Sequence, residues 1–386
     1  MLRVYRYRLY PTTAQAERME WTLWRLRELY NAALDERITA YRRAGKSLSG
    51  YDQMREIKAV REARPEYAAI HVHLLQDVLT RLERAYRAFF RRIKAGEKPG
   101  FPRFKGRGSY TSFTFKDAKN RNGVAFDAKT KRLRLTGIGE VKVKLHRKPE
   151  GTLKQVTVTL GGDGHWYACL SCDDVPTKPL PATGEAVGID VGITTFAALS
   201  DGTMVANPRH YERTQAALRR KRRVVARRKR GGNRRRKAVV VLRAHHDRVR
   251  RTRLDFHHKT ALGVVRRFDR IAVEDLNVTG LAMGRLAKQV QDAAWAQFTR
   301  ILESKAECAG REFVRVDPRG TSQRCSGCGA VVPKKLSVRV HDCPSCKLVL
   351  DRDENAARNI KRLGHSRRGG MSSGSPGEPR SPSLAF

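Results

Sequence analysis

The chain opens with a strand-like pattern of apolar and polar positions. Within residues 3–10, Tyr5, Tyr7 and Leu9 fall on one face and arginines alternate with them on the other. Such alternation is typical of a half-buried strand. Pro11 then ends the pattern, because proline has no N–H to donate to a ladder. A strand this short must pair with strands from elsewhere in the chain.

Helical spacing replaces alternation after this strand. Thr12 and Gln15 have the spacing of a capping box, and an amphipathic helix follows them. Apolar residues at steps of three and four predict a shorter helix over 51–62 and a longer one over about 71–93. Together these segments predict a helical bundle.

Short alternating segments come next. They follow the basic, aromatic and turn-rich stretch 98–105, whose two prolines and glycine exclude a helix. Alternation then predicts strands near 133–135, 141–145, 156–160 and 166–170. Several short strands at this spacing indicate a small β-barrel. We expect the N-terminal strand to join this barrel, with the helical bundle as an insertion.

The second half of the chain carries buried strands with carboxylates in or after them. Residues 186–193 form an apolar strand that contains Asp190, and 195–199 is a plausible partner strand. A further apolar strand at 271–273 leads directly to Glu274. The remaining predicted elements are helices over 210–268, about 290–309 and 353–362, and a strand over 313–316.

Charge narrows the class of partner. The 386 residues include 80 Lys and Arg against 38 Asp and Glu, a net charge of +42. Self-repulsion of this size destabilises a compact state unless a polyanion neutralises it. Nucleic acid is the first expected partner, and an anionic membrane surface is the second. No stretch approaches the roughly 18 apolar residues of a membrane span, and the first residues lack the apolar region of a signal peptide.

Cysteine usage agrees with a reducing compartment. Four of the seven cysteines form two pairs with spacing two, fourteen and two, close to that of a four-cysteine zinc ribbon. Four thiolates close a tetrahedral shell, so we expect structural Zn²⁺, with an iron–sulfur cluster or a redox dithiol as alternatives. The predicted zinc ligands are Cys325, Cys328, Cys343 and Cys346. The expected location is the cytoplasm, with association to the nucleoid when DNA is bound.

Three carboxylates are the candidates for catalysis. Asp190 lies inside an apolar strand, where an unpaired charge is costly. Glu274 closes a buried strand, and Asp353 opens a helix, where the dipole favours a carboxylate. A surface strand end and an ordinary first-turn acid are the alternative interpretations of the last two. Together the three suit two divalent cations about 3.5–4 Å apart that activate water against a phosphodiester, and carboxylates favour Mg²⁺ or Mn²⁺.

At this point the chain resembles the TnpB family, whose members are encoded by insertion sequences and are similar to compact single-chain CRISPR nucleases. Residues 188–202 resemble the first motif of a RuvC-type nuclease with the RNase H fold, 274–276 the second, and 351–357 the third. Residues 321–329, which read TSQRCSGCG, resemble the TnpB zinc ribbon. The order of these motifs is more specific than any one of them, and the resemblance covers nearly the whole chain.

The resemblance implies an RNA-guided DNA endonuclease of a transposable element. Such a protein binds a transposon-derived guide RNA, recognises a short motif beside a double-stranded DNA target, and cuts with one RuvC site. The family acids fall on Asp190, Glu274 and Asp353, with Asp351 as the second choice for the third position. The implied cofactors are Mg²⁺ or Mn²⁺, structural Zn²⁺ and guide RNA. A monomer bound to RNA is the expected oligomeric state.

Nucleic-acid contacts are expected in three places. Target-side recognition in the family uses the helical lobe, and the basic run 216–253 is expected to hold structured RNA by its backbone. A solvated helix face is the alternative for that run, and simple packing is the alternative for the aromatic residues near 101–104. The residues predicted to contact nucleic acid are Tyr51, Gln76, Phe101, Arg103, Phe104, Arg222, Arg228 and Arg235.

The expected fold is a multidomain α+β protein. It combines a RuvC/RNase H-like α/β nuclease domain carrying an inserted zinc ribbon with a small β-barrel wedge domain carrying an inserted helical bundle. The expected boundaries are a wedge over 1–10 and 94–178, a helical recognition lobe over 11–93, a nuclease domain over 179–319 and 349–364, a ribbon over 320–348, and a disordered tail over 365–386. The alternative functions are a catalytically silent nucleic-acid-binding regulator on a RuvC-like scaffold and an accessory transposase.

Overall fold

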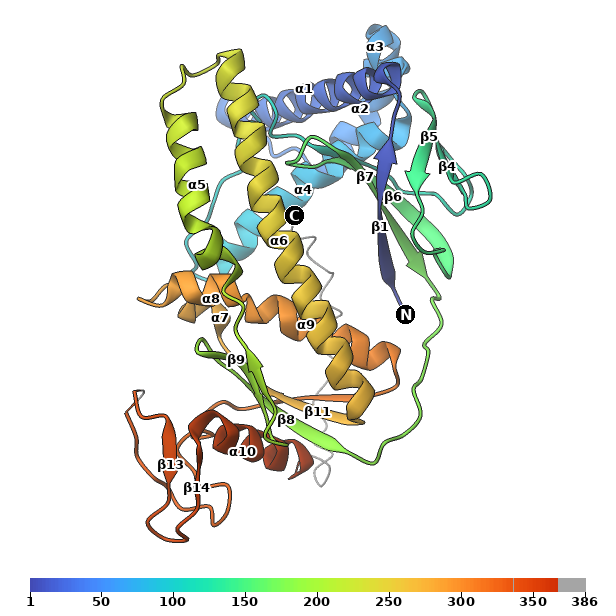
Figure 1. Ribbon diagram of the computed structural model, residues 1–386. Coiled ribbons are helices and arrows are strands. Elements are labelled where there is room, and N and C mark those ends of the chain that lie inside the picture. Colours follow the sequence, from blue (N-terminus) through green and yellow to red (C-terminus); the bar gives the residue numbers. More distant parts are fainter. Residues whose placement is uncertain (336, 367–386) are drawn as a thin grey trace. The chain divides into compact units, whose positions relative to one another are not determined.

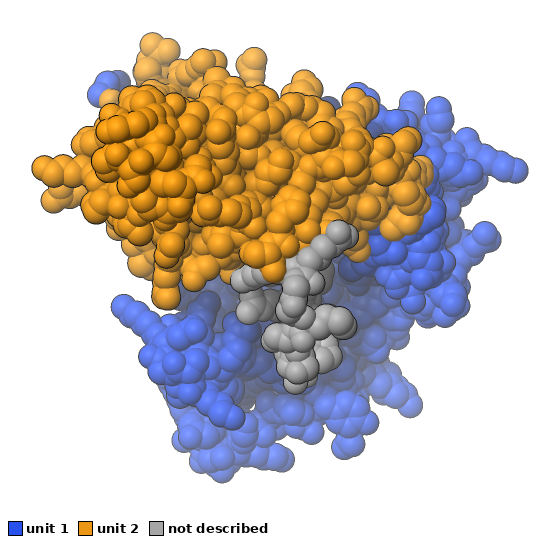
Figure 2. Space-filling model, turned by 90° about the horizontal axis from the view of Figure 1, so that it is seen from below, with its two compact units in different colours: residues 1–176, 221–247 blue, residues 177–220, 248–386 orange. Residues whose placement is uncertain are grey.

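The computed structural model describes residues 1–335 and 337–366, which fall into two compact units. Unit 1 comprises residues 1–176 and 221–247, and unit 2 comprises the other described residues (Figure 2). Figure 1 labels the helices and strands of both units. The division falls within the long basic helices, so the domain boundaries expected from the sequence stay a prediction.

Unit 1 is built on one antiparallel sheet of seven strands in the order β2-β6-β7-β1-β5-β4-β3. The strands are β1 (Arg3–Tyr10), β2 (Ser112–Phe115), β3 (Val124–Asp127), β4 (Arg132–Leu135), β5 (Gly139–Lys144), β6 (Thr152–Leu160) and β7 (Trp166–Asp173). β1 pairs with β7 and β5, so the N-terminal strand lies in the centre of the sheet as its alternation predicts. In the described part of the chain, the end strands β2 and β3 are not paired with each other. The predicted barrel is therefore a near-closed, barrel-like sheet.

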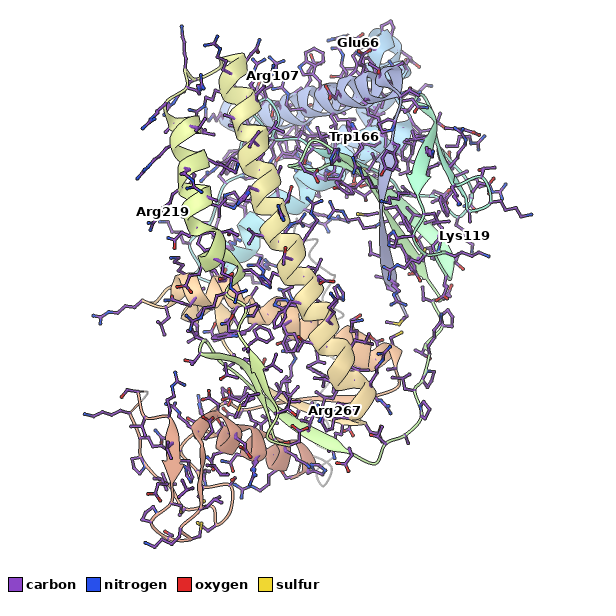
Figure 3. The ribbon with its side chains drawn as sticks, viewed as in Figure 1. Glu66, Arg107, Lys119, Trp166, Arg219 and Arg267 are labelled. Atoms are coloured by element: carbon purple, nitrogen blue, oxygen red, sulfur yellow. The ribbon has the colours of Figure 1, made fainter. Side chains whose placement is uncertain are left out.

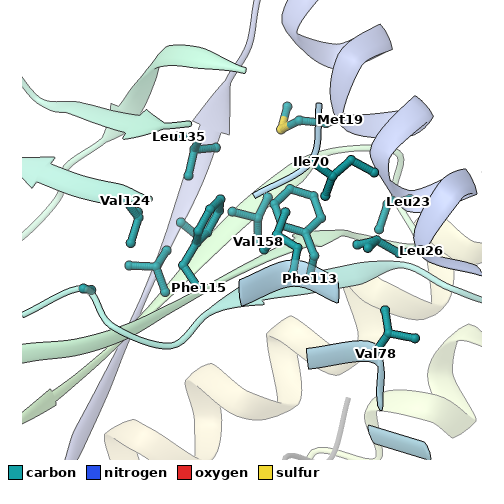
Figure 4. Packing of buried hydrophobic residues seen from close by; sticks show 14 of the residues in the cluster. Met19, Leu23, Leu26, Ile70, Val78, Phe113, Phe115, Val124, Leu135 and Val158 are labelled. Carbon is teal, nitrogen blue, oxygen red and sulfur yellow. The ribbon is translucent and has the colours of Figure 1, made fainter. Parts of the chain in front are cut away.

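Four helices between β1 and β2 accompany this sheet: α1 (Thr13–Ala44), α2 (Gly50–Ala63), α3 (Pro65–Ala68) and α4 (Val72–Lys94). The predicted capping box is present, since the Thr12 hydroxyl accepts from the N–H of Gln15 and the Gln15 side chain accepts from the N–H of Thr12. Buried apolar residues of these helices pack together with those of the sheet in one core (Figure 4). The residues drawn there include Met19, Leu23, Leu26, Ile70, Val78, Phe113, Phe115, Val124, Leu135 and Val158.

Unit 2 contains a five-stranded sheet in the order β10-β9-β8-β11-β12. Its strands are β8 (Ala186–Val191), β9 (Thr195–Leu199), β10 (Met204–Ala206), β11 (Arg270–Glu274) and β12 (Glu312–Val316). β8, β11 and β12 run parallel, whereas β9 is antiparallel to β8 and β10 is antiparallel to β9. The three parallel strands therefore end at the same edge of the sheet.

The helix α10 (Arg352–Ser366) packs closely against the middle of this sheet. A Cβ on Gly188 of β8 would enter the backbone of α10 at Ala357 and Lys361, and a Cβ on Gly364 would lie 2.6 Å from the Cβ of Ala272. Glycine at these two places allows the helix and sheet backbones to approach. Of the predicted tail, residues 365 and 366 belong to α10 and the rest lies outside the described residues.

The other helices of the second half are α5 (His210–Ala226), α6 (Asn233–Arg267), α7 (Val278–Leu281), α8 (Ala287–Ala293) and α9 (Trp295–Cys308). The single helix predicted over 290–309 is wrong, because Ala294 adopts a left-handed conformation with φ 50° and separates α8 from α9. β13 (Val340–Asp342) pairs with β14 (Val349–Asp351) beside the cysteine pairs. Within 1–335 and 337–366, no helix has the length and apolar character needed to cross a membrane.

Candidate active site

Asp190 and Glu274 lie on neighbouring parallel strands at their carboxyl ends. Ile189 of β8 pairs with Val273 of β11 in the ladder. The next residue on each strand is an acid, so Asp190 and Glu274 are neighbours across the two strands. Asp353 lies in the first turn of α10, which packs on β8. Its Oδ2 lies 3.7 Å from the position a Cβ would take on Gly192, just after β8. Packing of α10 thus brings the third acid to the edge where the first two meet.

The environment of Asp190 is unfavourable for its own charge. Burial raises the pKa of Asp190 well above its usual range, and the negative charges of Glu274 and Asp353 raise it further. Arg352 and the N–H of Val191 act in the opposite direction. Three carboxylates that repel one another in a desolvated place form an arrangement typical of functional sites.

The other two acids are shifted in the same direction. Burial raises the pKa of Glu274, while a hydrogen bond donated by the Thr321 hydroxyl to Oε1 over 2.5 Å opposes the shift. Burial and the neighbouring Asp351 raise the pKa of Asp353, and Arg339 opposes this shift with its Nη1 3.6 Å from Oδ2. The side chain of Asp353 is only 16 % exposed.

Asp351 has a different environment from Asp353. It is exposed, and its Oδ1 accepts from the N–H groups of Asp353 at 2.8 Å and Glu354 at 3.3 Å. These bonds satisfy donors at the start of α10, as a capping residue does. Asp353, and not Asp351, is the acid whose charge acts on Asp190. The choice of the second aspartate for the third catalytic position stays a prediction.

The donor set suits hard divalent cations, because carboxylate oxygens are the ligands that Mg²⁺ prefers. A cation would offset the repulsion that raises the pKa of Asp190. Among the described residues, the group of three or more side chains arranged closely enough to hold a metal ion is the cysteine quartet.

The cysteine quartet has the geometry of a tetrahedral metal site. The four Sγ atoms lie within 4.8 Å of one another, with Cys325 and Cys346 3.5 Å apart and Cys328 and Cys343 3.6 Å apart. Thiolates bound to Zn²⁺ at about 2.3 Å have comparable separations. Backbone N–H groups of Cys346 and Ser345 lower the pKa of the Cys343 thiol. The predicted zinc ribbon is confirmed as a cluster that could hold zinc.

The residues predicted to contact nucleic acid are spread over several elements. Tyr51 on α2 is 65 % exposed, with the guanidinium of Arg55 4.6 Å from its ring centroid. Phe101 meets Phe89 edge-on at 5.3 Å and is half exposed, so it both packs and presents a face. Gln76 on α4 is partly buried. Their contacts with nucleic acid stay predictions.

The arginines of α5, α6 and the turn between them divide into two kinds. Arg222 and Arg228 are exposed, as is Arg219 on α5, which Figure 3 labels. Arg235 instead donates through Nη1 to the carbonyl of Val225 at 2.9 Å and to that of Arg228 at 3.4 Å. It therefore closes the turn between α5 and α6. Arg103 and Phe104 are exposed in the loop before β2.

Two buried asparagines near the site were given no role from the sequence. Asn355 and Asn359 are 0 % and 2 % exposed on one face of α10 and bind backbone groups of the segment 321–326. Thr321, which binds Glu274, belongs to the same network. The available signal was two polar residues four apart in an otherwise apolar helix face, since such residues are buried only with partners.

Comparisons with known proteins agree with this architecture. The family model OrfB_IS605, described as "Probable transposase", matches residues 169–284, a Cas12f1-like TNB domain matches 295–360, and a helix-turn-helix domain matches 1–46. In this structure the last of these spans β1 and α1. A cryo-EM structure of a Cas12f1–sgRNA–target DNA complex has a TM-score of 0.57 at 16 % identity, covering 91 % of this chain and 83 % of that chain. At this identity the likeness shows the fold alone.

Two relatives are similar over most of the chain. A Streptomyces pristinaespiralis protein named "Putative RNA-guided DNA endonuclease" is 35 % identical over 385 residues, covering 94 % of this chain and 89 % of the relative. The InsQ protein of Escherichia coli K12, which carries the same descriptive name, is 28 % identical over 309 residues, covering 76 % and 74 %. With the acid order and the cysteine cluster, these matches show that the chain belongs to the OrfB family of IS605-type elements, the TnpB family that its motifs resemble.

Proposed function

We propose that the chain is an RNA-guided DNA endonuclease that hydrolyses phosphodiester bonds at Asp190, Glu274 and Asp353. The observation that carries this proposal is that Asp190 and Glu274 end neighbouring parallel strands and that α10 packs Asp353 against the same edge, where burial and the other two charges raise the pKa of Asp190. The two relatives that align over most of the chain bear the name of this activity. A desolvated set of three carboxylates has no structural role that would stabilise the fold, since each charge destabilises the others.

The three acids are proposed to hold Mg²⁺ or Mn²⁺. Bound there, the cations would lower the pKa of a water nucleophile and stabilise the leaving oxygen. Two of these carboxylates are oriented by their surroundings. The Thr321 hydroxyl fixes one oxygen of Glu274, and α10 fixes the backbone of Asp353. Arg339 adds a positive charge beside Asp353, where a substrate phosphate would benefit from it.

The nuclease part is proposed to be a RuvC/RNase H-like domain. Support comes from the order β10-β9-β8-β11-β12, with three parallel strands and an antiparallel second strand, and from the acids at the ends of β8 and β11. The barrel-like sheet of unit 1 and its inserted helices are proposed to be the wedge and recognition lobes that the family resemblance implies. Ligands of α/β sheets bind at the carboxyl ends of parallel strands, which agrees with this placement.

Guide RNA and target DNA are the proposed partners. The net charge of +42 requires a polyanion to neutralise it, and exposed arginines cover α5 and the turn before α6. The protein of the similar solved structure is itself held in a complex with guide RNA and target DNA. Cytoplasmic location, with nucleoid association when DNA is bound, stays a prediction.

Copurified RNA and the variant Asp190→Ala test the proposal together. The protein should purify with an RNA whose 3′ portion names the guide, and with this RNA it should cut matching DNA in Mg²⁺. D190A should retain the RNA and lose cutting. RNA and DNA binding without cleavage by the wild-type protein would favour the silent regulator. Strand-transfer products would instead favour an accessory transposase.

A further inference from the structure

The knuckle that contains Cys325 is hydrogen-bonded to the helix that carries Asp353. The Nδ2 of Asn355 donates to the carbonyl of Arg324 at 2.8 Å, and its Oδ1 accepts from the N–H of Ser326 at 2.9 Å. One buried amide therefore holds the residues before and after a zinc ligand. Asn355 stands only two residues after Asp353 in the same helix.

A second asparagine extends the same clamp. The Nδ2 of Asn359, one turn further along α10, donates to the carbonyl of Arg324 at 2.7 Å and to that of Thr321 at 2.9 Å. Residues four apart share a helix face, so both amides meet the segment 321–326 from one side. Both asparagine amides are buried, so separating α10 from the segment 321–326 would leave their N–H groups without acceptors. The cost of such unsatisfied donors stabilises the contact.

Thr321 carries this contact to the nuclease site. Its hydroxyl has one hydrogen and lies 2.5 Å from Oε1 of Glu274 and 3.1 Å from the carbonyl of Pro318. The shorter distance is typical of a charge-assisted bond to a carboxylate, so the Thr321 hydroxyl donates its hydrogen to Glu274. Thr321 is 4 % exposed, so its hydroxyl is shielded from solvent.

We propose that Thr321 and Asn355 are positioning residues that couple the zinc knuckle to the catalytic carboxylates. Zinc fixes Cys325, the two asparagines fix the knuckle to α10, and Thr321 fixes the orientation of Glu274. Zinc binding then raises the affinity of the acids for divalent cations, and those cations raise the affinity of the cysteines for zinc, since coupling between sites is reciprocal. This inference rests on the nuclease site of the proposed function and assigns the ribbon a role in organising it.

The matched pair Thr321→Val and Thr321→Ser tests the first step in the full chain with its copurified RNA. Valine keeps the shape without a donor, whereas serine keeps the hydroxyl. Bound Mn²⁺ is measured by electron paramagnetic resonance, with D190A giving the background from RNA. T321V should bind Mn²⁺ about 10–100-fold more weakly with its zinc content and melting temperature unchanged, and T321S should restore most of the affinity. Equal Mn²⁺ affinity in T321V and the wild type would overturn the inference and leave the function standing.

The variant Asn355→Ala tests the link to zinc. Zinc affinity is measured by equilibrium competition with a chromophoric chelator, with and without saturating Mg²⁺, which thiolates do not bind. Mg²⁺ should tighten zinc binding by at least about 5-fold in the wild type and not in N355A or D190A. If Mg²⁺ leaves the zinc affinity of the wild type unchanged, the coupling does not exist. If instead the wild type binds no more Mn²⁺ than D190A, the metal site of the proposed function itself is wrong.

Discussion

The Nη1 of Arg339 lies 3.6 Å from Oδ2 of Asp353 and joins the segment before β13 to the first turn of α10. The same guanidinium donates through Nη2 to the hydroxyl of Thr194 at 2.8 Å, which ties it to the loop after β8. Arg339 is thus the cation that meets the third acid from the side of the ribbon. Its charge opposes the rise in the pKa of Asp353 that burial and Asp351 cause.

Replacing Arg339 by Gln should move the acidic limb of the pH–activity profile to higher pH. Without the guanidinium, burial and Asp351 act on Asp353 unopposed by this charge, and its pKa rises further. Because Asp353 must be ionised to bind a cation, cutting should then begin at a higher pH. The measurement is the DNA cleavage rate from about pH 5 to 9 at saturating Mg²⁺.

Arg358→Gln is the matched control for this shift. Arg358 is on the same helix and pairs with Glu354 at 2.7 Å, and neither residue is among the three acids. R358Q should keep the wild-type acidic limb. A uniformly lower rate in R339Q with an unmoved limb would mean that Arg339 contacts the substrate without tuning Asp353.

Asp190→Asn should stabilise the metal-free protein at neutral pH. The pKa of Asp190 in the folded state is raised by burial and by Glu274 and Asp353. A carboxyl with a raised folded pKa contributes stability below its unfolded pKa and loses that contribution as pH rises through the folded value. The neutral amide of asparagine does not suffer this loss. Each kcal/mol gained in the free energy of unfolding raises the melting temperature by about 2–4 °C.

The advantage of D190N should reverse when divalent cations are added. Thermal unfolding is followed in chelator and in excess Mg²⁺, at neutral pH and again near pH 4, where the gap between variant and wild type should narrow. Mg²⁺ should raise the melting temperature of the wild type by mass action and leave that of D190N nearly unchanged. An equal rise in melting temperature with Mg²⁺ in both proteins would show that the cation binds at a site that does not include Asp190.

Much of the site could be predicted from the sequence because its acids interrupt clear apolar patterns. Asp190 and Glu274 stand at the ends of strands that are recognisable from the sequence as short apolar runs. β2 was missed although its four residues alternate between polar and apolar, because so short a segment beside a turn-rich stretch does not distinguish a strand from a loop. The break at Ala294 was missed because alanine favours a helix and only tertiary packing holds it at φ 50°. The hydrogen bond from Thr321 to Glu274 joins residues 47 apart in the sequence and forms only through tertiary packing, so no local pattern predicts it.

Neutralising Arg222 and Arg228 together should weaken RNA binding and flatten its salt dependence. Arg222 on α5 and Arg228 in the turn after it are both exposed, so each can contact a phosphate. Each lost contact lowers the slope of log affinity against log salt by about 0.7–0.9. Binding of the copurified RNA is measured by filter retention at several salt concentrations for R222Q/R228Q and the wild type.

Two further variants separate contact from structure in that test. Lys58→Gln removes a charge from an exposed position on α2 and should leave the slope unchanged if the contacts lie on the basic helices. Arg235→Gln removes the donor that closes the α5–α6 turn and should lower thermal stability. An identical loss of slope in K58Q would show that total charge, and not the basic helices, governs RNA binding.

Gly188→Ala should destabilise unit 2 and impair cutting together. The added methyl group would enter the backbone of α10 at Ala357, so the helix must move away from β8. Overpacking of this kind costs about 1–3 kcal/mol, and the movement carries Asp353 away from Asp190. Gly263→Ala is the matched control, because Gly263 lies in α6 with nothing within 4 Å of its Cβ position. G263A should raise stability by about 0.5–1 kcal/mol and cut at the wild-type rate. Thermal unfolding and cleavage assays decide the matter, and wild-type cutting by a destabilised G188A would show that the acids tolerate displacement of the helix.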